Sequence, residues 1–284
     1  MRTDVETLNS PETLWATPTV YRPDLFKNKV ALVSGGGSGI GRAVALLFAR
    51  LGANVVICGR TQEKLDSVAK FAKSKKAKIL PIVANIREPE QVAALFEKIE
   101  KEFGALDILV NNAGGQFPQA AIDIPAKGWS AVINNNLNGT WFMMQRAAQH
   151  WRDKKRPGSI VNVIVVTDRG MPGVAHTVAA RAGVIGLART VAVEWAPLNI
   201  RVNCLAPGLT ATEGLDVYPP EAQKEFPRAN PMKRPGTPME MAEACVYLAG
   251  PSGSFITGEV LTVDGGGRLW GELWTAGRPD YFKG

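Results

Sequence analysis

The chain has 284 residues, 45% of them hydrophobic, and carries 33 Lys and Arg against 26 Asp and Glu, a formal net charge of +7. This length allows one large core, and α/β proteins of this size are commonly a single domain. No apolar stretch reaches the roughly 20 residues of a membrane helix, and the polar start lacks the order of a signal peptide. We therefore expect a soluble, cytoplasmic protein.

The cysteines and the basic residues exclude further classes of protein. Cys58, Cys204 and Cys245 are far apart and form no paired motif, which argues against a zinc site or a disulfide framework and predicts no bound metal. The lysine-rich run at 73–78 has no interleaved aromatic residues, so it indicates a solvated helix face. We expect neither a nucleic acid nor a membrane as partner.

Short apolar runs alternate with helical patterns along the chain, which predicts parallel strands joined by right-handed crossovers. The pattern is typical of an α/β fold with a doubly wound parallel sheet of seven strands. The expected strands are residues 30–34, 54–58, 79–83, 108–111, 159–165, 200–205 and 259–263.

Helical spacing of apolar residues predicts helices over 39–51, 88–103 and 129–151. Residues 209–238 are rich in Pro, Glu and Lys and follow a strand end, so we expect a mobile substrate lid there. We divide the chain into an N-terminal extension (1–27), one domain (28–267) and a C-terminal tail (268–284). Trp15, Trp270, Trp274 and Tyr281 predict that both ends dock on this subunit or on a neighbour.

The first expected strand ends in a glycine-rich turn that opens a helix. Gly35 permits the tight turn, and side chains at Gly37 or Gly39 would keep the backbone from approaching a phosphate. The helix start adds free N–H groups and the positive end of its dipole. The segment therefore predicts a site for a dinucleotide diphosphate.

The end of the second strand indicates which dinucleotide binds. An NAD-preferring protein normally places an acidic residue there, whereas this chain has Arg60. An arginine, assisted by Ser38, pairs with a 2′-phosphate, so we expect NADP as the cofactor. Asn85 and Ile86, after the third strand, should flank the adenine.

Five motifs in order resemble those of the short-chain dehydrogenase/reductase family, over about residues 27–267. They are the SGGGSGIG turn, NNAG at 111–114, Asn136 in NNLNGT, Pro207-Gly208 with Thr212, and ITG with VDGG near the end. The resemblance implies a Rossmann-type fold and a nicotinamide cofactor, with further contacts from Ile40, Asn112, Ala113, Gly114, Pro207, Gly208 and Thr212. The runs NNAGGQF, KGW, SIVNVIV and AARAGV are similar to those of peroxisomal trans-2-enoyl-CoA reductases and their bacterial relatives.

The family's usual catalytic set of Asn, Ser, Tyr and Lys is altered in this chain. Asn136 is present, and we expect it to kink its helix and to face the cofactor-holding residue through a water. The alignment places Arg181 at the lysine position, Thr177 at the tyrosine and Ile164 at the serine. No tyrosine lies between Tyr21 and Tyr218 to restore the set.

These substitutions change the chemistry that the site supports. A threonine hydroxyl is too weak an acid to act as a base near neutral pH, and an arginine stays cationic, but Thr177 and Arg181 still donate hydrogen bonds. Both suit the oxyanion that forms when hydride adds to a double bond conjugated to a thioester. His176 is either a proton donor or a helix-start histidine that faces solvent or its own backbone. Asp168 and Arg169 lie either on the substrate path or in a surface pair.

We therefore expect an NADPH-dependent reductase of an acyl thioester, with trans-2-enoyl-CoA as the first choice of substrate. Two alternatives remain: a dehydrogenase of a hydrophobic or terpenoid alcohol that uses His176 as its base, and a cofactor-binding homologue without turnover. The helix with small residues at Ala179, Ala182, Gly183 and Gly186 predicts a homo-oligomer, and we expect a homotetramer.

Overall fold

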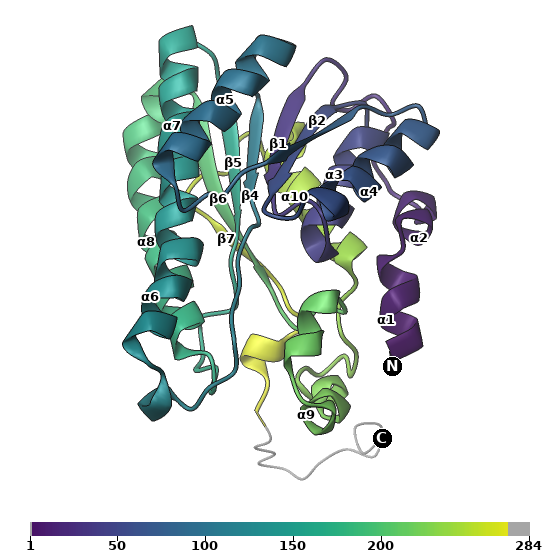
Figure 1. Cartoon of the computed structure of the whole chain (residues 1–284), viewed down its shortest axis with the longest axis vertical. Helices are drawn as coiled ribbons and strands as arrows, with labels where there is room; N and C mark the ends of the chain where they lie inside the picture. Colours follow the sequence, from purple (N-terminus) through teal and green to yellow (C-terminus); the bar gives the residue numbers. More distant parts are fainter. Residues whose placement is uncertain (1, 272–284) are drawn as a thin grey trace.

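A seven-stranded parallel sheet forms the centre of the protein, in the order β3-β2-β1-β4-β5-β6-β7 (Figure 1). The computed structural model describes residues 2–271. Within them the strands are β1 (Val30–Ser34), β2 (Asn54–Gly59), β3 (Ile79–Val83), β4 (Ile108–Asn111), β5 (Gly158–Val163), β6 (Ile200–Pro207) and β7 (Val260–Val263). This confirms the predicted doubly wound sheet in a single domain.

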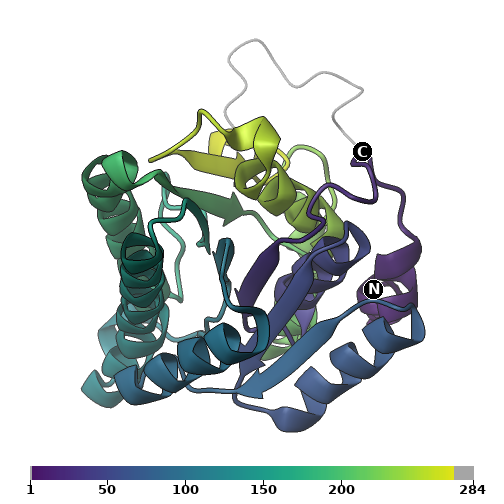
Figure 2. The same cartoon turned by 90° about the horizontal axis from the view of Figure 1, so that it is seen from above.

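Helices cover both faces of the sheet, which is why its central strands are almost continuously apolar (Figure 2). One layer holds α3 (Gly39–Arg50), α4 (Gln62–Ser74) and α10 (Pro238–Ala249). The other holds α5 (Pro89–Phe103), α7 (Gly139–Lys154) and α8 (Ala175–Trp195). Short 3-10 turns are η1 (Ala121–Asp123), η3 (Ala196–Leu198), η6 (Pro251–Gly253) and η7 (Gly267–Leu269).

The helix predicted over 129–151 is interrupted at its centre. It consists of α6 (Ala126–Ile133), a π-helical turn, η2 (Asn134–Asn138), and then α7. A π turn inserts an extra residue and redirects the side chains around it, often at functional sites. The kink predicted at Asn136 therefore takes this form, and it buries the Asn136 side chain beside the ends of the strands.

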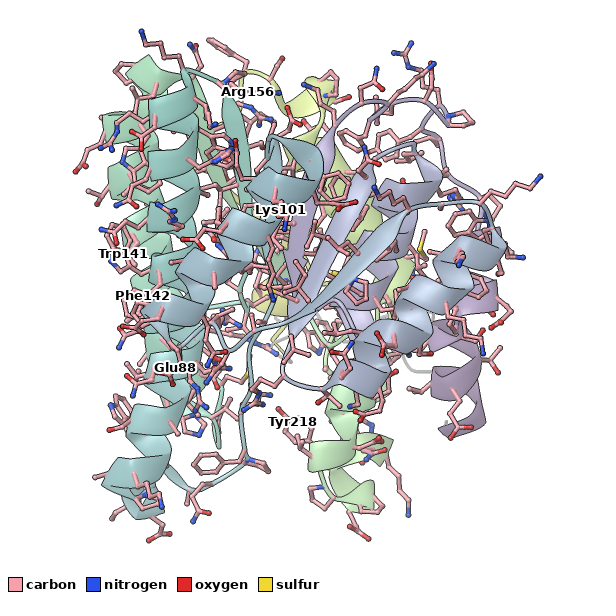
Figure 3. The ribbon with its side chains drawn as sticks, turned by 45° about the horizontal axis from the view of Figure 1, so that its top comes forward. Glu88, Lys101, Trp141, Phe142, Arg156 and Tyr218 are labelled. Carbon is pink, nitrogen blue, oxygen red and sulfur yellow. The ribbon has the colours of Figure 1, made fainter. Side chains whose placement is uncertain are left out.

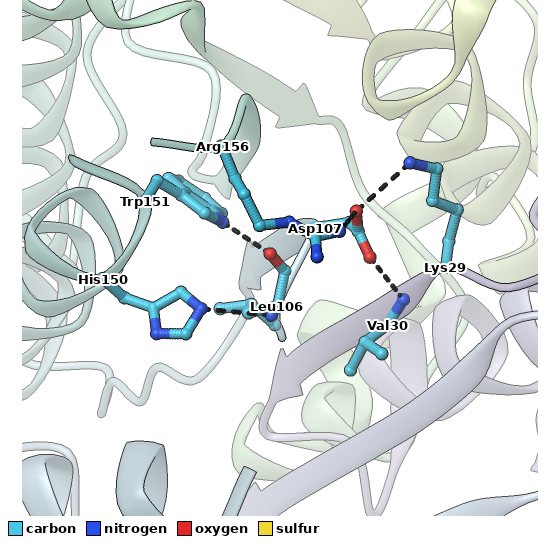
Figure 4. Close-up of polar contacts among 7 residues, drawn as sticks. All are labelled: Lys29, Val30, Leu106, Asp107, His150, Trp151 and Arg156. Atoms are coloured by element: carbon cyan, nitrogen blue, oxygen red, sulfur yellow. Dashed lines mark hydrogen bonds and ion pairs between the residues drawn. The ribbon is translucent and has the colours of Figure 1, made fainter. Parts of the chain in front are cut away.

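A polar cluster ties together the amino ends of β1 and β4 (Figure 4). The Asp107 carboxylate accepts hydrogen bonds from the Val30 backbone N–H (2.9 Å), the Lys29 ammonium (3.2 Å) and the Arg156 guanidinium (3.1 Å). Next to it, the Trp151 indole N–H donates to the Leu106 carbonyl at 2.7 Å. Each of these buried polar groups has its partner, so the cluster stabilises the fold at the end of the sheet away from the glycine turn.

Residues 209–238, which we call the lid, lie beyond the carboxyl ends of the strands (Figure 1). It contains η4 (Glu213–Val217), α9 (Pro220–Lys224) and η5 (Phe226–Arg228). Backbone hydrogen bonds between Leu209, Ala211 and Gly236 join its two ends, so it leaves and rejoins the domain at one point. Residues 209–238 are thus partly helical, and their role as a mobile substrate lid stays a prediction.

The N-terminal extension packs on the domain through α1 (Arg2–Asn9) and α2 (Pro11–Ala16). Leu14 is buried in the core layer that α3 and α10 share, and the Asn9 amide donates to the Ala211 carbonyl at 2.7 Å. The docking predicted for Trp274 and Tyr281 falls outside the described residues. Within residues 2–271, no helix is both long enough and apolar enough to cross a bilayer.

Candidate active site

The turn between β1 and α3 brings backbone N–H groups to the carboxyl edge of the sheet. Gly35 and Gly39 have φ of 68° and 51°, values that favour glycine. A Cβ on Gly41 would lie 2.3 Å from the Gly35 carbonyl oxygen, so α3 starts in direct contact with the turn. The turn itself is therefore built from backbone, and its glycines leave the N–H groups at the start of α3 uncovered by side chains of the turn.

A carboxylate from the lid faces this helix start. Glu213 accepts a hydrogen bond from the Gly39 N–H at 3.1 Å and forms an ion pair with Arg42. An anionic group is favourable at a helix N-terminus. Glu213 therefore takes the position that a cofactor phosphate would need. No sequence pattern predicts this contact, because the two residues are 174 positions apart.

A cavity of about 250 Å³ lies at the ends of β1, β2 and β3. The exposed Arg60 lines it and has no ion pair within residues 2–271, and Ser38 makes no side-chain cap on α3. Lys64, which the sequence reasoning missed, adds a second cation. The other predicted cofactor residues in its wall are Gly35, Gly37, Asn85, Ile86, Asn112, Ala113 and Gly114. This donor set fits the phosphates and the adenosine half of a dinucleotide.

A second cavity, of about 630 Å³, adjoins the first through Asn112 and Gly114. Its walls hold Ile40, Asn136, Thr177, Arg181, Pro207, Gly208 and Thr212 of the predicted residues. Apolar side chains make up much of the rest: Val163, Ile164, Val166, Met171, Pro172, Val174, Leu209, Leu215, Val217 and Phe226. Ile164 thus presents an alkyl group where the family's serine would present a hydroxyl.

The Asn136 side chain binds the backbone of the loop after β4. Its side-chain oxygen accepts from the Gly115 N–H and its amide donates to the Gly115 carbonyl, both at 3.0 Å. Its own backbone carbonyl, in the π turn, accepts from the Thr140 hydroxyl at 3.0 Å and from the Arg181 guanidinium at 3.2 Å. Asn136 therefore contacts Arg181 directly, whereas the sequence predicted a contact through water.

Arg181 is the central charge of the second cavity. It is 6% exposed, and it donates hydrogen bonds to the carbonyls of Asn136 and Ala113. Burial lowers the pKa of Arg181 to about 10, so the guanidinium stays protonated near neutral pH. Among the described residues it forms no ion pair with a carboxylate. A Cβ on Gly114 would lie 2.2 Å from the guanidinium, which explains the glycine there.

Thr177 lines the same cavity, one helical turn before Arg181, and is 2% exposed. Its hydroxyl lies 3.4 Å from the His176 Nδ1. Its backbone N–H is already used, since it donates to the Val174 carbonyl (3.0 Å) and to the His176 Nδ1 (2.8 Å). A bound molecule would therefore have to take the Thr177 hydroxyl from its 3.4 Å contact with the His176 Nδ1.

His176 is fully buried and does not line the cavity. Its ring packs edge-on against Phe117, with 4.5 Å between ring centroids, and its Nε2 has no partner within residues 2–271. Of the two readings of His176, the contact of its Nδ1 with the local backbone matches the second, although the ring does not face solvent. No cluster of three or more potential metal ligands occurs in the described part of the chain.

The sequence reasoning missed two further side chains in the wall of the second cavity. Gln116 follows the NNAGG motif, and Tyr218 comes from the lid. The Gln116 amide donates to the Tyr218 hydroxyl at 2.6 Å, across 102 positions of sequence. No sequence pattern marks Tyr218 as a site residue, because its position depends on how residues 209–238 fold.

Comparisons with known proteins agree with this geometry. The family model described as enoyl-(acyl carrier protein) reductase matches residues 35–267. A 3-oxoacyl-(acyl-carrier-protein) reductase of Thermotoga maritima is 39% identical over 85% of this chain and 98% of its own length. A probable 2,4-dienoyl-CoA reductase of Bacillus subtilis is 37% identical over 85% of this chain and 97% of its own.

A solved structure supports the same assignment. The citronellol catabolism dehydrogenase of Pseudomonas aeruginosa superposes with a TM-score of 0.80 at 37% identity, over 89% of this chain and all of its own. The two chains therefore share the fold over nearly the whole of this chain. The chain belongs to the short-chain dehydrogenase/reductase family, whose members bind a nicotinamide cofactor.

Proposed function

We propose that the protein reduces acyl thioesters with NADPH, and that its substrate is a trans-2-enoyl-CoA. The observation that carries this proposal is the Arg181 guanidinium, a buried cation without a carboxylate partner in the described structure, in the wall of an apolar cavity. A buried charge is costly unless it is compensated. A reaction that develops negative charge beside Arg181 supplies that compensation.

Enoyl thioester reduction is such a reaction. The bound cofactor supplies a hydride to the β carbon, and negative charge then collects on the thioester oxygen. That Arg181 and Thr177 both line the cavity supports assigning the guanidinium and the hydroxyl as donors to that oxyanion. Alcohol oxidation needs instead a base that removes a hydroxyl proton. Neither Thr177 nor Arg181 is such a base.

The shape and charge of the second cavity support a CoA thioester. Its apolar walls suit an acyl chain, and the exposed guanidinium groups of Arg169 and Arg268 line its rim. Cations at a rim attract a phosphorylated carrier. Two of the relatives are also named for the reduction of acyl thioesters.

The preference for NADPH rests on the first cavity. Arg60 and Lys64 supply two positive charges there, and the Ser38 hydroxyl is not used as a helix cap. An arginine pairs with a phosphate through charge-assisted hydrogen bonds. These groups suit the 2′-phosphate that distinguishes NADP from NAD.

Two other functions remain as rivals. The name of the Pseudomonas neighbour favours a dehydrogenase of a terpenoid alcohol, and in this chain His176 would have to be its base. His176 does not line the cavity, so that mechanism needs a rearrangement. The third candidate is a cofactor-binding homologue without turnover.

A substrate panel separates the three. Purified protein is mixed with NADPH and short or long trans-2-enoyl-CoAs, and in parallel with NADP⁺ and aliphatic or terpenoid alcohols, while cofactor absorbance is followed. We expect oxidation of NADPH with the enoyl thioesters and negligible reduction of NADP⁺. Alcohol oxidation that is lost in His176→Gln would favour the dehydrogenase, and tight NADPH binding without turnover would favour the non-catalytic protein.

We also propose that the chain forms a homotetramer. The outer face of α8 exposes Ala179, Ala182 and Gly186 in a row, followed by Val193, which is 77% exposed. A face of small and apolar residues allows close packing of helices from two subunits. Light scattering at micromolar concentration should give four times the chain mass, and a monomer would contradict this proposal.

A further inference from the structure

Tyr218 brings a phenol to the same cavity that holds Thr177 and Arg181. It directly follows η4 in the lid, and Figure 3 shows it projecting from the lid ribbon toward the ends of the strands. Its ring packs edge-on against Phe226, with 5.7 Å between ring centroids. Within residues 2–271, no other tyrosine lines this cavity.

Hydrogen bonds fix the Tyr218 oxygen relative to the site. The Gln116 amide donates to this oxygen at 2.6 Å, and Gln116 follows Gly115, which Asn136 holds by two hydrogen bonds. Because the phenolic oxygen is the acceptor, its own proton is not used in that bond. Tyr218 therefore has a positioned oxygen and a proton to donate.

The protonation state of Tyr218 suits a donor. Burial raises the pKa of Tyr218 above its ordinary value, so the phenol carries its proton throughout the neutral range. The other donors in the wall serve less well. Arg181 stays cationic and is a poor proton shuttle, and the Thr177 hydroxyl is a much weaker acid than a phenol.

We propose that Tyr218 is the catalytic acid of enoyl thioester reduction. Hydride from NADPH forms a bond to the β carbon, the electron pair of the double bond moves to the α carbon and the thioester oxygen, and the Tyr218 O–H bond breaks as its proton joins the α carbon. The phenolate then takes a proton from water. An enolate carbon is far more basic than a phenolate, so even a weakly acidic phenol completes this step. This inference rests on the proposed function.

The test uses Tyr218→Phe, which keeps the ring that packs on Phe226 and removes only the hydroxyl. With crotonyl-CoA and NADPH, we expect kcat to fall by about a hundredfold or more while KM changes little, because general acids typically contribute that much. Tyr247→Phe, on α10 and outside both cavities, is the matched control and should behave as the unmodified enzyme. Melting temperature and NADPH affinity should be unchanged in both variants.

A second measurement separates proton donation from a structural role. In D₂O, a fixed donor delivers deuterium to one face of the α carbon, so the unmodified enzyme should give one stereoisomer, as read by NMR. In Tyr218→Phe water must supply the deuteron, and the product should become a mixture formed slowly.

The outcomes distinguish the inference from the function on which it rests. If the unmodified enzyme reduces crotonyl-CoA and Tyr218→Phe does so equally well and with the same stereochemistry, Tyr218 is not the acid, although the proposed function stands. If the variant loses NADPH binding or stability together with activity, a structural role replaces the catalytic one. If the unmodified enzyme reduces no enoyl thioester, the proposed function fails, and this inference fails with it.

Discussion

The two ends of the sheet differ in whether their buried charged side chain has a partner of opposite charge. At the amino ends, the Asp107 carboxylate has three donors, from Val30, Lys29 and Arg156 (Figure 4). At the carboxyl ends, the guanidinium of Arg181 is more deeply buried but contacts only neutral carbonyls among the described residues. A satisfied charge holds a fold together, whereas one left without its counter-charge is available to a ligand or a transition state. Changes at the two ends should therefore affect different measurements.

The largest effect should come from the catalytic end. Thr177→Val keeps the shape of the side chain and removes the hydroxyl that we assign to the oxyanion. Loss of one such donor lowers turnover by about a hundredfold to a thousandfold. Steady-state kinetics with NADPH and an enoyl-CoA should show this decrease with an unchanged melting temperature. A variant as active as the unmodified enzyme would remove Thr177 from the mechanism.

A substitution at the amino ends of the strands should lower the stability of the protein rather than its turnover. Asp107→Ala leaves the buried Val30 N–H without its acceptor, so we expect the free energy of unfolding to fall by about 1–3 kcal/mol. Urea denaturation measures this change. Turnover per folded molecule should stay the same, and a large change in kcat would contradict the separation between the two ends.

Cofactor preference should depend mainly on Arg60, one of the two exposed cations that line the first cavity. Arg60→Ala removes the arginine–phosphate pair, and NADPH should then bind about tenfold to a hundredfold more weakly while NADH affinity stays constant. Fluorescence titration with both cofactors checks this. Equal affinity for NADPH and NADH in the unmodified protein would show that the end of β2 does not select the cofactor.

The smallest effect concerns the lid carboxylate at the start of α3. Glu213 accepts from the Gly39 N–H, so NADPH has to displace it. Glu213→Gln removes the negative charge, and NADPH should bind roughly twofold to fivefold more tightly, the size of one charge at a helix end. Weaker binding of NADPH by this variant would mean that Glu213 contributes to the cofactor site rather than competing with it.

The positions of the glycine turn and of Arg60 at the carboxyl edge of the sheet were predictable because their signals are local. Gly35, Gly39 and Arg60 lie within one strand–turn–helix unit and the strand that follows it, where spacing alone fixes which side of the sheet each residue reaches. The seven strands were found for the same reason, since each is a short apolar run between turn signals.

The substrate end was less predictable because it depends on contacts distant in sequence. Tyr218 contacts Gln116, and Glu213 contacts Gly39, because the lid lies over the ends of the strands. His176 illustrates the same point: its sequence position suggested a place in the site, but its ring turns toward Phe117. Neighbourhood in the sequence did not determine which of these side chains faces the cavity.

We propose that hydride passes from NADPH to the β carbon of an enoyl thioester. NADPH that carries deuterium at its transferable position, incubated with the enzyme and crotonyl-CoA, tests this transfer. Mass spectrometry and NMR of the product should find one deuterium at the β carbon and a solvent-derived hydrogen at the α carbon. Recovery of crotonyl-CoA without deuterium, under conditions in which NADPH is bound, would contradict the account.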